Sequence, residues 1–165
     1  SGLLIRSNKV MYDVNTFSVF DTFRGSAVTG PLAKKGITLQ RAGVVTSRWG
    51  AWKKAHPTTT VLAEALALGR DFDFRNNREL GPIFPIGDVD ARLPVHEDVL
   101  GIVTDRGTPV AFHLKTTVAA LKNGEKITVD NVHLVLDGDG VRAVDVGGKN
   151  LGSHQAFWFA WSQFY

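Results

Sequence analysis

The chain has 165 residues, of which 44% are hydrophobic and 21% are charged, and this composition is typical of one globular domain rather than a disordered chain. The net charge is only +3 and no basic run exceeds a Lys-Lys pair, so we expect no nucleic-acid partner. The absence of Cys excludes disulfides and thiolate chemistry within these residues. No apolar run approaches the roughly 20 residues that a membrane-spanning helix needs. The sequence begins inside an apolar segment, and we interpret it as part of a longer protein.

Short β-strands are predicted in the N-terminal part of the chain. The segments "KVMYD" (9–13), "FSVFDTF" (17–23) and "GITLQRAGVV" (36–45) carry β-branched and aromatic residues between Gly, Asn and Ser breaks. Alternate positions of the second segment mix polar and aromatic residues on both faces, so we expect this strand to be partly buried on each side.

The first predicted helix covers "TSRWGAWKKAHP" (46–57), which a Thr or Ser would cap and a Pro would end. Trp49, Trp52 and His56 stand at positions i, i+3 and i+7, which lie on one helix face. We therefore expect His56 to be at least half buried and to form a hydrogen bond.

A long segment, 69–96, is rich in Asp, Arg, Gly and Pro and has no clear period. We interpret it as a long ordered loop with Phe72, Phe74 and Phe84 inserted into the core, because a mobile loop with these rings would expose a large apolar patch. Within a single domain of residues 1–165, this loop would join two sub-lobes, 1–68 and 97–165.

The C-terminal part predicts hairpins and short helices. Segments 99–114 and 132–146 read as antiparallel hairpins that turn at Asp-Arg-Gly and Asp-Gly-Asp-Gly sequences. Segment 116–124, "TTVAALKNG", predicts a helix closed by Asn-Gly, and 154–165 could form another. The fold class that follows is β-rich α+β, with antiparallel hairpins and two or three short helices.

One pattern suggests an internal repeat. "WGAWKKAH" (49–56) and "WFAWSQFY" (158–165) share Trp-x-Ala-Trp, and each follows a β pattern and a turn that contains Gly. A duplicated strand–turn–helix unit would give two pseudo-repeated lobes with all four Trp mostly buried. The alternative is chance, since the shared pattern is short.

Motifs for metal and cofactor chemistry are missing. The five His residues show no metal-ligand spacing, so we predict no metal site. Neither a nucleophile elbow, a phosphate loop nor a dinucleotide fingerprint is present, and we predict no cofactor.

Four motifs in order, "SGLLIRSNKVMYD", "RWGAWKKAHPTTTVL", "RLPVHEDVLGI" and "AFWFAWSQFY", resemble those of a bacterial and archaeal family, the domain of unknown function DUF3179. The resemblance covers nearly the whole chain. It implies a protein that is exported or membrane-anchored, as members often are, and it implies no activity. Many members carry Cys-Pro-x-Cys just upstream of the Ser-Gly-Leu-Leu segment, a stretch that this sequence does not include.

The sequence also departs from the family pattern. Val14 stands where an Arg usually follows Met-Tyr-Asp, and Phe20 stands where Trp is usual. The hairpin strand that usually ends Ala-Tyr-Pro here ends Ala-Phe-His, at His113. Without the Arg, Asp13 lacks a bidentate partner that a site built on an Asp-Arg pair would use.

Two functions stay open at this point, and the sequence does not decide whether the chain is an enzyme. The leading hypothesis is a non-catalytic extracytoplasmic module that binds a ligand or a protein through an aromatic surface, with Tyr12, Trp52 and His113 as candidate contact residues. The alternative is a hydrolase-like enzyme with Asp13 and His56 as acid/base groups. For Asp13 itself we favour a structural role over a catalytic one, with its carboxylate accepting backbone N–H bonds where the strand turns.

Overall fold

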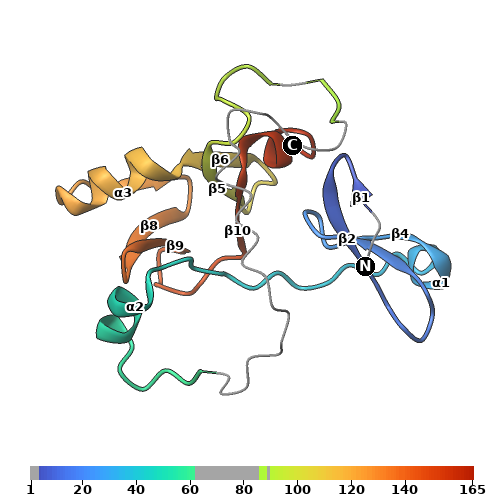
Figure 1. The fold of residues 1–165 in the computed structure, drawn as a ribbon, viewed down its shortest axis with the longest axis horizontal. Coiled ribbons are helices and arrows are strands. Elements are labelled where there is room, and N and C mark those ends of the chain that lie inside the picture. The colour runs from blue at the N-terminus through green and yellow to red at the C-terminus, as the bar shows by residue number, and fades with distance from the viewer. Residues whose placement is uncertain (1–3, 62–85, 89) are drawn as a thin grey trace.

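The computed structural model describes residues 4–61, 86–88 and 90–165. Within these residues ten strands form three antiparallel sheets, and four short helices accompany them (Figure 1). This confirms the predicted β-rich α+β class. None of the described helices has the length and apolar character needed to cross a bilayer. The predicted insertion of Phe72, Phe74 and Phe84 concerns residues outside those described.

The N-terminal sheet has the order β1-β2-β3-β4, and every neighbouring pair is antiparallel. Its strands are β1 (Leu4–Ile5), β2 (Asn8–Tyr12), β3 (Val19–Asp21) and β4 (Ala27–Thr29), and helix α1 (Gly30–Lys34) follows directly. The first two strand predictions are confirmed here, although the second strand is shorter than expected.

The central sheet has the order β10-β5-β6 and is covered on both faces. Its strands are β5 (Asp98–Val103), β6 (Pro109–His113) and β10 (Ser153–Phe157), and α4 (Trp158–Ser162) continues from β10. Because side chains alternate along a strand, β5 can feed two separate cores, and four of its six residues are buried.

One core lies between the central sheet and α4. Its buried members are Phe23, Val99, Trp158, Phe159, Ala160, Trp161 and Phe164. Gly101 faces this core, because a β-carbon there would lie 2.1 Å from the ring of Trp161. Trp161 therefore packs directly on the β5 backbone.

The other core lies between the central sheet and a third sheet of order β7-β8-β9. That sheet contains β7 (Ile127–Val129), β8 (Val132–Asp137) and β9 (Gly140–Val144), and helix α3 (Leu114–Lys122) adds apolar side chains at the margin. The buried members of this core are Leu100, Ile102, Val132, Leu134, Val141 and Ala143. Both predicted C-terminal hairpins, β5–β6 and β8–β9, are confirmed, as is the helix predicted at 116–124.

The N-terminal sheet is joined to the C-terminal residues through Phe23. The Phe23 ring stacks on Phe164 at a centroid distance of 4.8 Å, and Tyr165 donates from its hydroxyl to the Phe23 carbonyl at 3.2 Å. Arg24 donates to the Phe164 carbonyl at 2.8 Å. Segments far apart in the sequence thus share one core.

The strand predicted at 36–45 is wrong. Its described pairing is a single bridge between Thr38 and Ser26, and Leu39 and Val44 are 52% and 60% exposed. The β-branched composition favours an extended backbone, but a strand also needs a partner edge, and this segment instead connects two parts of the molecule.

The predicted internal repeat is also wrong. Helices do form at both Trp-x-Ala-Trp patterns, in α2 (Trp49–Ala55) and α4, but Trp49 is 54% exposed while Trp158 and Trp161 are buried. Helix α4 continues from a paired strand and covers the central sheet, whereas α2 follows an unpaired segment and lies beside the β8–β9 turn (Figure 1). The similarity of the two segments is therefore chance.

Candidate functional site

The loop between β2 and β3 is organised by Asp13. Its carboxylate accepts hydrogen bonds from the N–H and the hydroxyl of Thr16, both at 2.8 Å. The Asp13 carbonyl accepts from the Phe17 N–H at 2.8 Å, and the Asp13 N–H donates to Ser18 at 2.9 Å. The hydroxyl and then the backbone N–H of Thr16 hold the pKa of Asp13 below its ordinary value. This is the geometry of a turn-forming carboxylate.

The same loop displays aromatic residues to solvent. Phe17 is 74% exposed and has φ +54°, a left-handed conformation that is rare for a bulky side chain and that Gly or Asn adopts more easily. Its ring stacks on Tyr12, which is 49% exposed, at 6.5 Å and an interplanar angle of 12°. Met11 and Val14 are exposed beside them. We refer to Met11, Tyr12, Val14 and Phe17 as the hairpin tip.

A second cluster fixes helix α2 to the β8–β9 hairpin. His56 Nε2 contacts one oxygen of the buried Asp137 carboxylate, and Arg142 Nε donates to the other at 2.7 Å. The His56 ring lies 4.0 Å from the Trp52 ring, and the His56 side chain is 38% exposed. The predicted burial and hydrogen bonding of His56 are confirmed. Burial raises the pKa of Asp137, but the bonds from His56 and Arg142 outweigh it and lower that pKa overall.

The start of α2 is held by another carboxylate of the same turn. Asp139 accepts from the Ser47 hydroxyl at 2.7 Å and from the Arg48 N–H at 2.8 Å, and these bonds lower its pKa, with Ser47 as the largest cause. The sequence analysis predicted that a Thr or Ser would cap this helix, and that prediction is wrong. Ser47 binds the neighbouring turn, and no side chain caps α2. Gly138 has φ +64°, and a β-carbon there would lie 2.4 Å from Ser47 Oγ, so the turn admits this close contact only with Gly.

His113 belongs to a third cluster, at the junction of β6 and α3. Its Nε2 lies 2.8 Å from Glu97 Oε2, and its Nδ1 lies 3.1 Å from the Thr116 hydroxyl. With a proton on Nε2, the imidazole would donate to Glu97 and accept from Thr116, in a carboxylate–imidazole–hydroxyl order. The Thr116 hydroxyl can also donate to the His113 carbonyl at 3.1 Å, and its single proton serves either that carbonyl or Nδ1. The bond to the carbonyl braces the first turn of α3.

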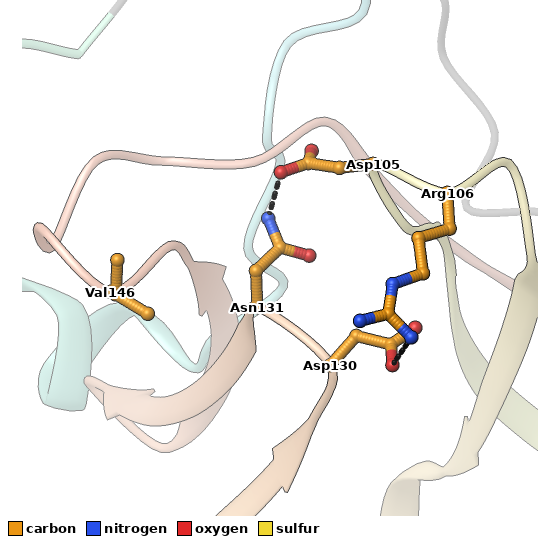
Figure 2. A pocket seen from close by; sticks show the side chains of 5 residues that line it. All are labelled: Asp105, Arg106, Asp130, Asn131 and Val146. Atoms are coloured by element: carbon orange, nitrogen blue, oxygen red, sulfur yellow. Dashed lines mark hydrogen bonds and ion pairs between the residues drawn. The ribbon is translucent and has the colours of Figure 1, made fainter.

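A shallow pocket of about 350 Å³ lies where two turns meet (Figure 2). Arg106 and Asp130 pair across it at 3.5 Å, while Asn131 donates to Asp105. Among the described residues, Asn131 Oδ1 is the buried side-chain atom that has no hydrogen-bond partner. Val146, 80% exposed, stands at its margin.

The candidate residues from the sequence lie in separate places. Asp13 and Tyr12 belong to the β2–β3 hairpin, and His56 and Trp52 belong to α2 on the opposite side of the molecule (Figure 1). The structure therefore brings Trp52 and His56 together but not Asp13 and His56, and His113 has its own partners.

Sequence reasoning missed Phe17, which it assigned to the start of a partly buried strand. The available signal was Asp-Val-Asn-Thr just before it, since Asp and Asn side chains hydrogen-bond the backbone nearby and so favour turns. Across residues 4–61, 86–88 and 90–165, no three His, Asp or Glu side chains gather as a metal ion would require.

Comparison with known proteins gives one match. A family model described as "Protein of unknown function (DUF3179)" matches residues 1–147. No curated protein and no solved structure matches the chain.

Proposed function

Because the chain belongs to the DUF3179 family, whose description assigns no function, we propose from the geometry that it is a non-catalytic extracytoplasmic module that binds its partner through the hairpin tip. The observation that carries this proposal is the stacked, solvent-exposed pair of Tyr12 and Phe17.

Folding alone does not require exposed apolar side chains at the hairpin tip. Four neighbouring apolar side chains stand in solvent, with Val14 68% and Phe17 74% exposed. A left-handed backbone costs an L-residue about 1–2 kcal/mol, which a Gly at position 17 would avoid. Exposed apolar patches and strained residues concentrate at interaction sites, so we infer a binding role for this loop.

Two titratable clusters support the non-catalytic part of the proposal. Asp137 uses both carboxylate oxygens to hold His56 and Arg142, and Asp139 holds Ser47 and Arg48. These contacts fasten α2 to a hairpin, which is a structural task.

Site-specific photocrosslinking tests the proposal. Benzoylphenylalanine placed at Phe17 in the cells that make the protein should give reproducible adducts on irradiation. Benzoylphenylalanine at position 146 is the control, because Val146 is also exposed but lies on the β9–β10 connection. Equal adduct patterns from both positions, or no adduct to protein or lipid from position 17, would contradict a binding role for the tip.

The extracytoplasmic location is part of the proposal and rests on the resemblance to exported family members. Fractionation of cells that make the full-length protein tests it. Recovery of the protein in the cytoplasmic fraction would overturn this part alone.

A hydrolytic activity is the second candidate, and one observation favours it. Glu97, His113 and Thr116 stand in the order that hydrolases use to activate a hydroxyl nucleophile. If they act so, the purified protein should release p-nitrophenol from p-nitrophenyl acetate, and both His113→Ala and Thr116→Ala should abolish this release. A His133→Ala variant, which alters a His bonded to Thr128 in another sheet, controls for non-specific imidazole reactivity.

A further inference from the structure

We propose that the partner of the hairpin tip is an anionic lipid surface, into which Tyr12, Val14 and Phe17 insert while nearby lysines contact the headgroups. This inference rests on the proposed function and names the partner class for the same site.

The size and composition of the tip favour a bilayer over a protein. A stable protein interface buries about 800 Å² on each partner, in which 20–30 residues take part. The tip presents four apolar side chains at the end of a hairpin. Peripheral membrane binding requires only a few apolar side chains at the acyl boundary together with basic residues, and Tyr is well suited to the interface.

Several polar groups of the β2–β3 loop already have hydrogen-bond partners within the protein. The Asp13 carboxylate is already bonded to the N–H and hydroxyl of Thr16, and the Ser18 hydroxyl accepts from the Leu32 N–H at 3.0 Å. Backbone bonds between Asp13 and Ser18 close the loop internally. The loop backbone with Asp13 and the exposed Asn15 would therefore stay at headgroup level, while the Tyr12 and Phe17 rings reach the acyl boundary.

Charge around the tip has the sign that an anionic surface attracts. Lys9 is exposed on β2, two residues from Met11 and so on the same face of the strand. Lys34 and Lys35 are exposed at the end of α1, which the Leu32–Ser18 bond places at the base of the loop. Residues 4–35, which hold the N-terminal sheet and α1, carry five Lys or Arg and two Asp, a net charge of +3.

The two acidic residues of this segment, Asp13 and Asp21, offset only part of its positive charge, because they face five Lys or Arg. Asp13 is bound by Thr16, and Asp21 is buried and accepts from the Phe23 N–H at 2.7 Å. The exposed charges of the N-terminal sheet are therefore predominantly positive, as electrostatic attraction to anionic lipids requires.

Vesicle cosedimentation of the whole chain is the primary test. We expect binding to vesicles of phosphatidylcholine mixed with phosphatidylglycerol, weaker binding to phosphatidylcholine alone, and release as salt is raised. Phe17→Gly should weaken binding about tenfold or more, because the ring is lost while the loop conformation is favoured. Lys34→Ala and Lys35→Ala should each weaken binding about fivefold. Lys122→Ala, at an exposed site on α3, should have little effect.

Site-specific fluorescence gives an independent reading, and the absence of Cys makes single labelling simple. An environment-sensitive dye on Val14→Cys should shift to shorter wavelength with phosphatidylglycerol vesicles, and the same dye on Val146→Cys should not.

Three outcomes separate the two proposals. Insertion of position 14 that depends on Phe17 and the lysines supports the lipid assignment. No vesicle binding, together with a discrete protein adduct from benzoylphenylalanine at position 17, overturns the lipid assignment and leaves the binding module in place. No vesicle binding and no adduct overturn both.

Discussion

The indole of Trp161 lies against the main chain of Gly101, where an added β-carbon would be 2.1 Å from the ring. The ring cannot move aside easily, because Trp161 is 3% exposed and stacks on Tyr165 at 4.3 Å. This contact fixes α4 on the central sheet, and Phe164 and Tyr165 beyond it bind the N-terminal sheet. One glycine therefore helps position the sheet that carries the hairpin tip.

Gly101→Ala should lower the free energy of unfolding by about 1–3 kcal/mol, because overpacking forces the indole or the strand to shift. Chemical denaturation followed by Trp fluorescence measures this. Gly50→Ala is the matched control: no atom lies within 4 Å of its added β-carbon, and Ala favours helix α2, so stability should rise by up to about 1 kcal/mol. A Gly101→Ala protein as stable as the parent would show that the contact is not tight.

Phe17→Gly should leave the free energy of unfolding unchanged or raise it. Gly accepts the left-handed backbone that costs Phe about 1–2 kcal/mol, and the lost ring is 74% exposed. Phe17→Ala removes the ring but keeps the strained backbone, so it should be about 1 kcal/mol less stable than Phe17→Gly. If Phe17→Gly is instead less stable than the parent by urea denaturation, the ring supports the fold and the tip is not held for binding.

The elements that the sequence predicted well are those with local signals. The β8–β9 hairpin carries its turn in Asp-Gly-Asp-Gly, and α2 carries its apolar face and its terminating Pro. Segment 36–45 had strand composition but no partner strand, and pairing is a tertiary property that composition does not encode. The two Trp-x-Ala-Trp patterns show the same limit, since helix formation was local but burial depended on what each helix met.

The candidate site was predictable only in part, for a related reason. Tyr12 was a candidate from its motif, but its stacking partner Phe17 lay at what looked like the start of a strand. The strand begins at Val19 rather than at Phe17, and this two-residue shift leaves the Phe17 ring exposed where partial burial was expected. The partner of His56, Asp137, stands 81 residues away in the sequence, and no spacing rule connects the two.

His56→Ala should lower the free energy of unfolding by roughly 1–3 kcal/mol, because the buried Asp137 carboxylate loses the partner of one oxygen. Lys53→Ala, on the exposed side of the same helix, controls for changes in helix propensity. Thermal and urea unfolding of both variants gives the comparison. An equal loss in the two proteins would mean that the His56–Asp137 contact adds nothing to stability.

Acid should destabilise the protein partly through Asp137, and the sign follows from its pKa. Burial raises that pKa, but the hydrogen bonds from His56 and Arg142 lower it overall, below the ordinary value of 3.8. Between the folded and unfolded pKa values the unfolded chain binds more protons, so stability rises with pH. The contribution of Asp137 is complete above 3.8 and is lost as pH falls through the lower, folded pKa. Melting temperatures between about pH 4.5 and pH 2.5 should therefore fall less steeply for Asp137→Asn than for the parent, although the variant is less stable at neutral pH. Val141→Ala, which opens a space in the neighbouring core and removes no carboxylate, is the matched control and should give a pH curve parallel to that of the parent. If the slopes of Asp137→Asn and the parent coincide, Asp137 does not couple folding to acid pH, and the His56–Asp137–Arg142 cluster holds α2 by shape alone.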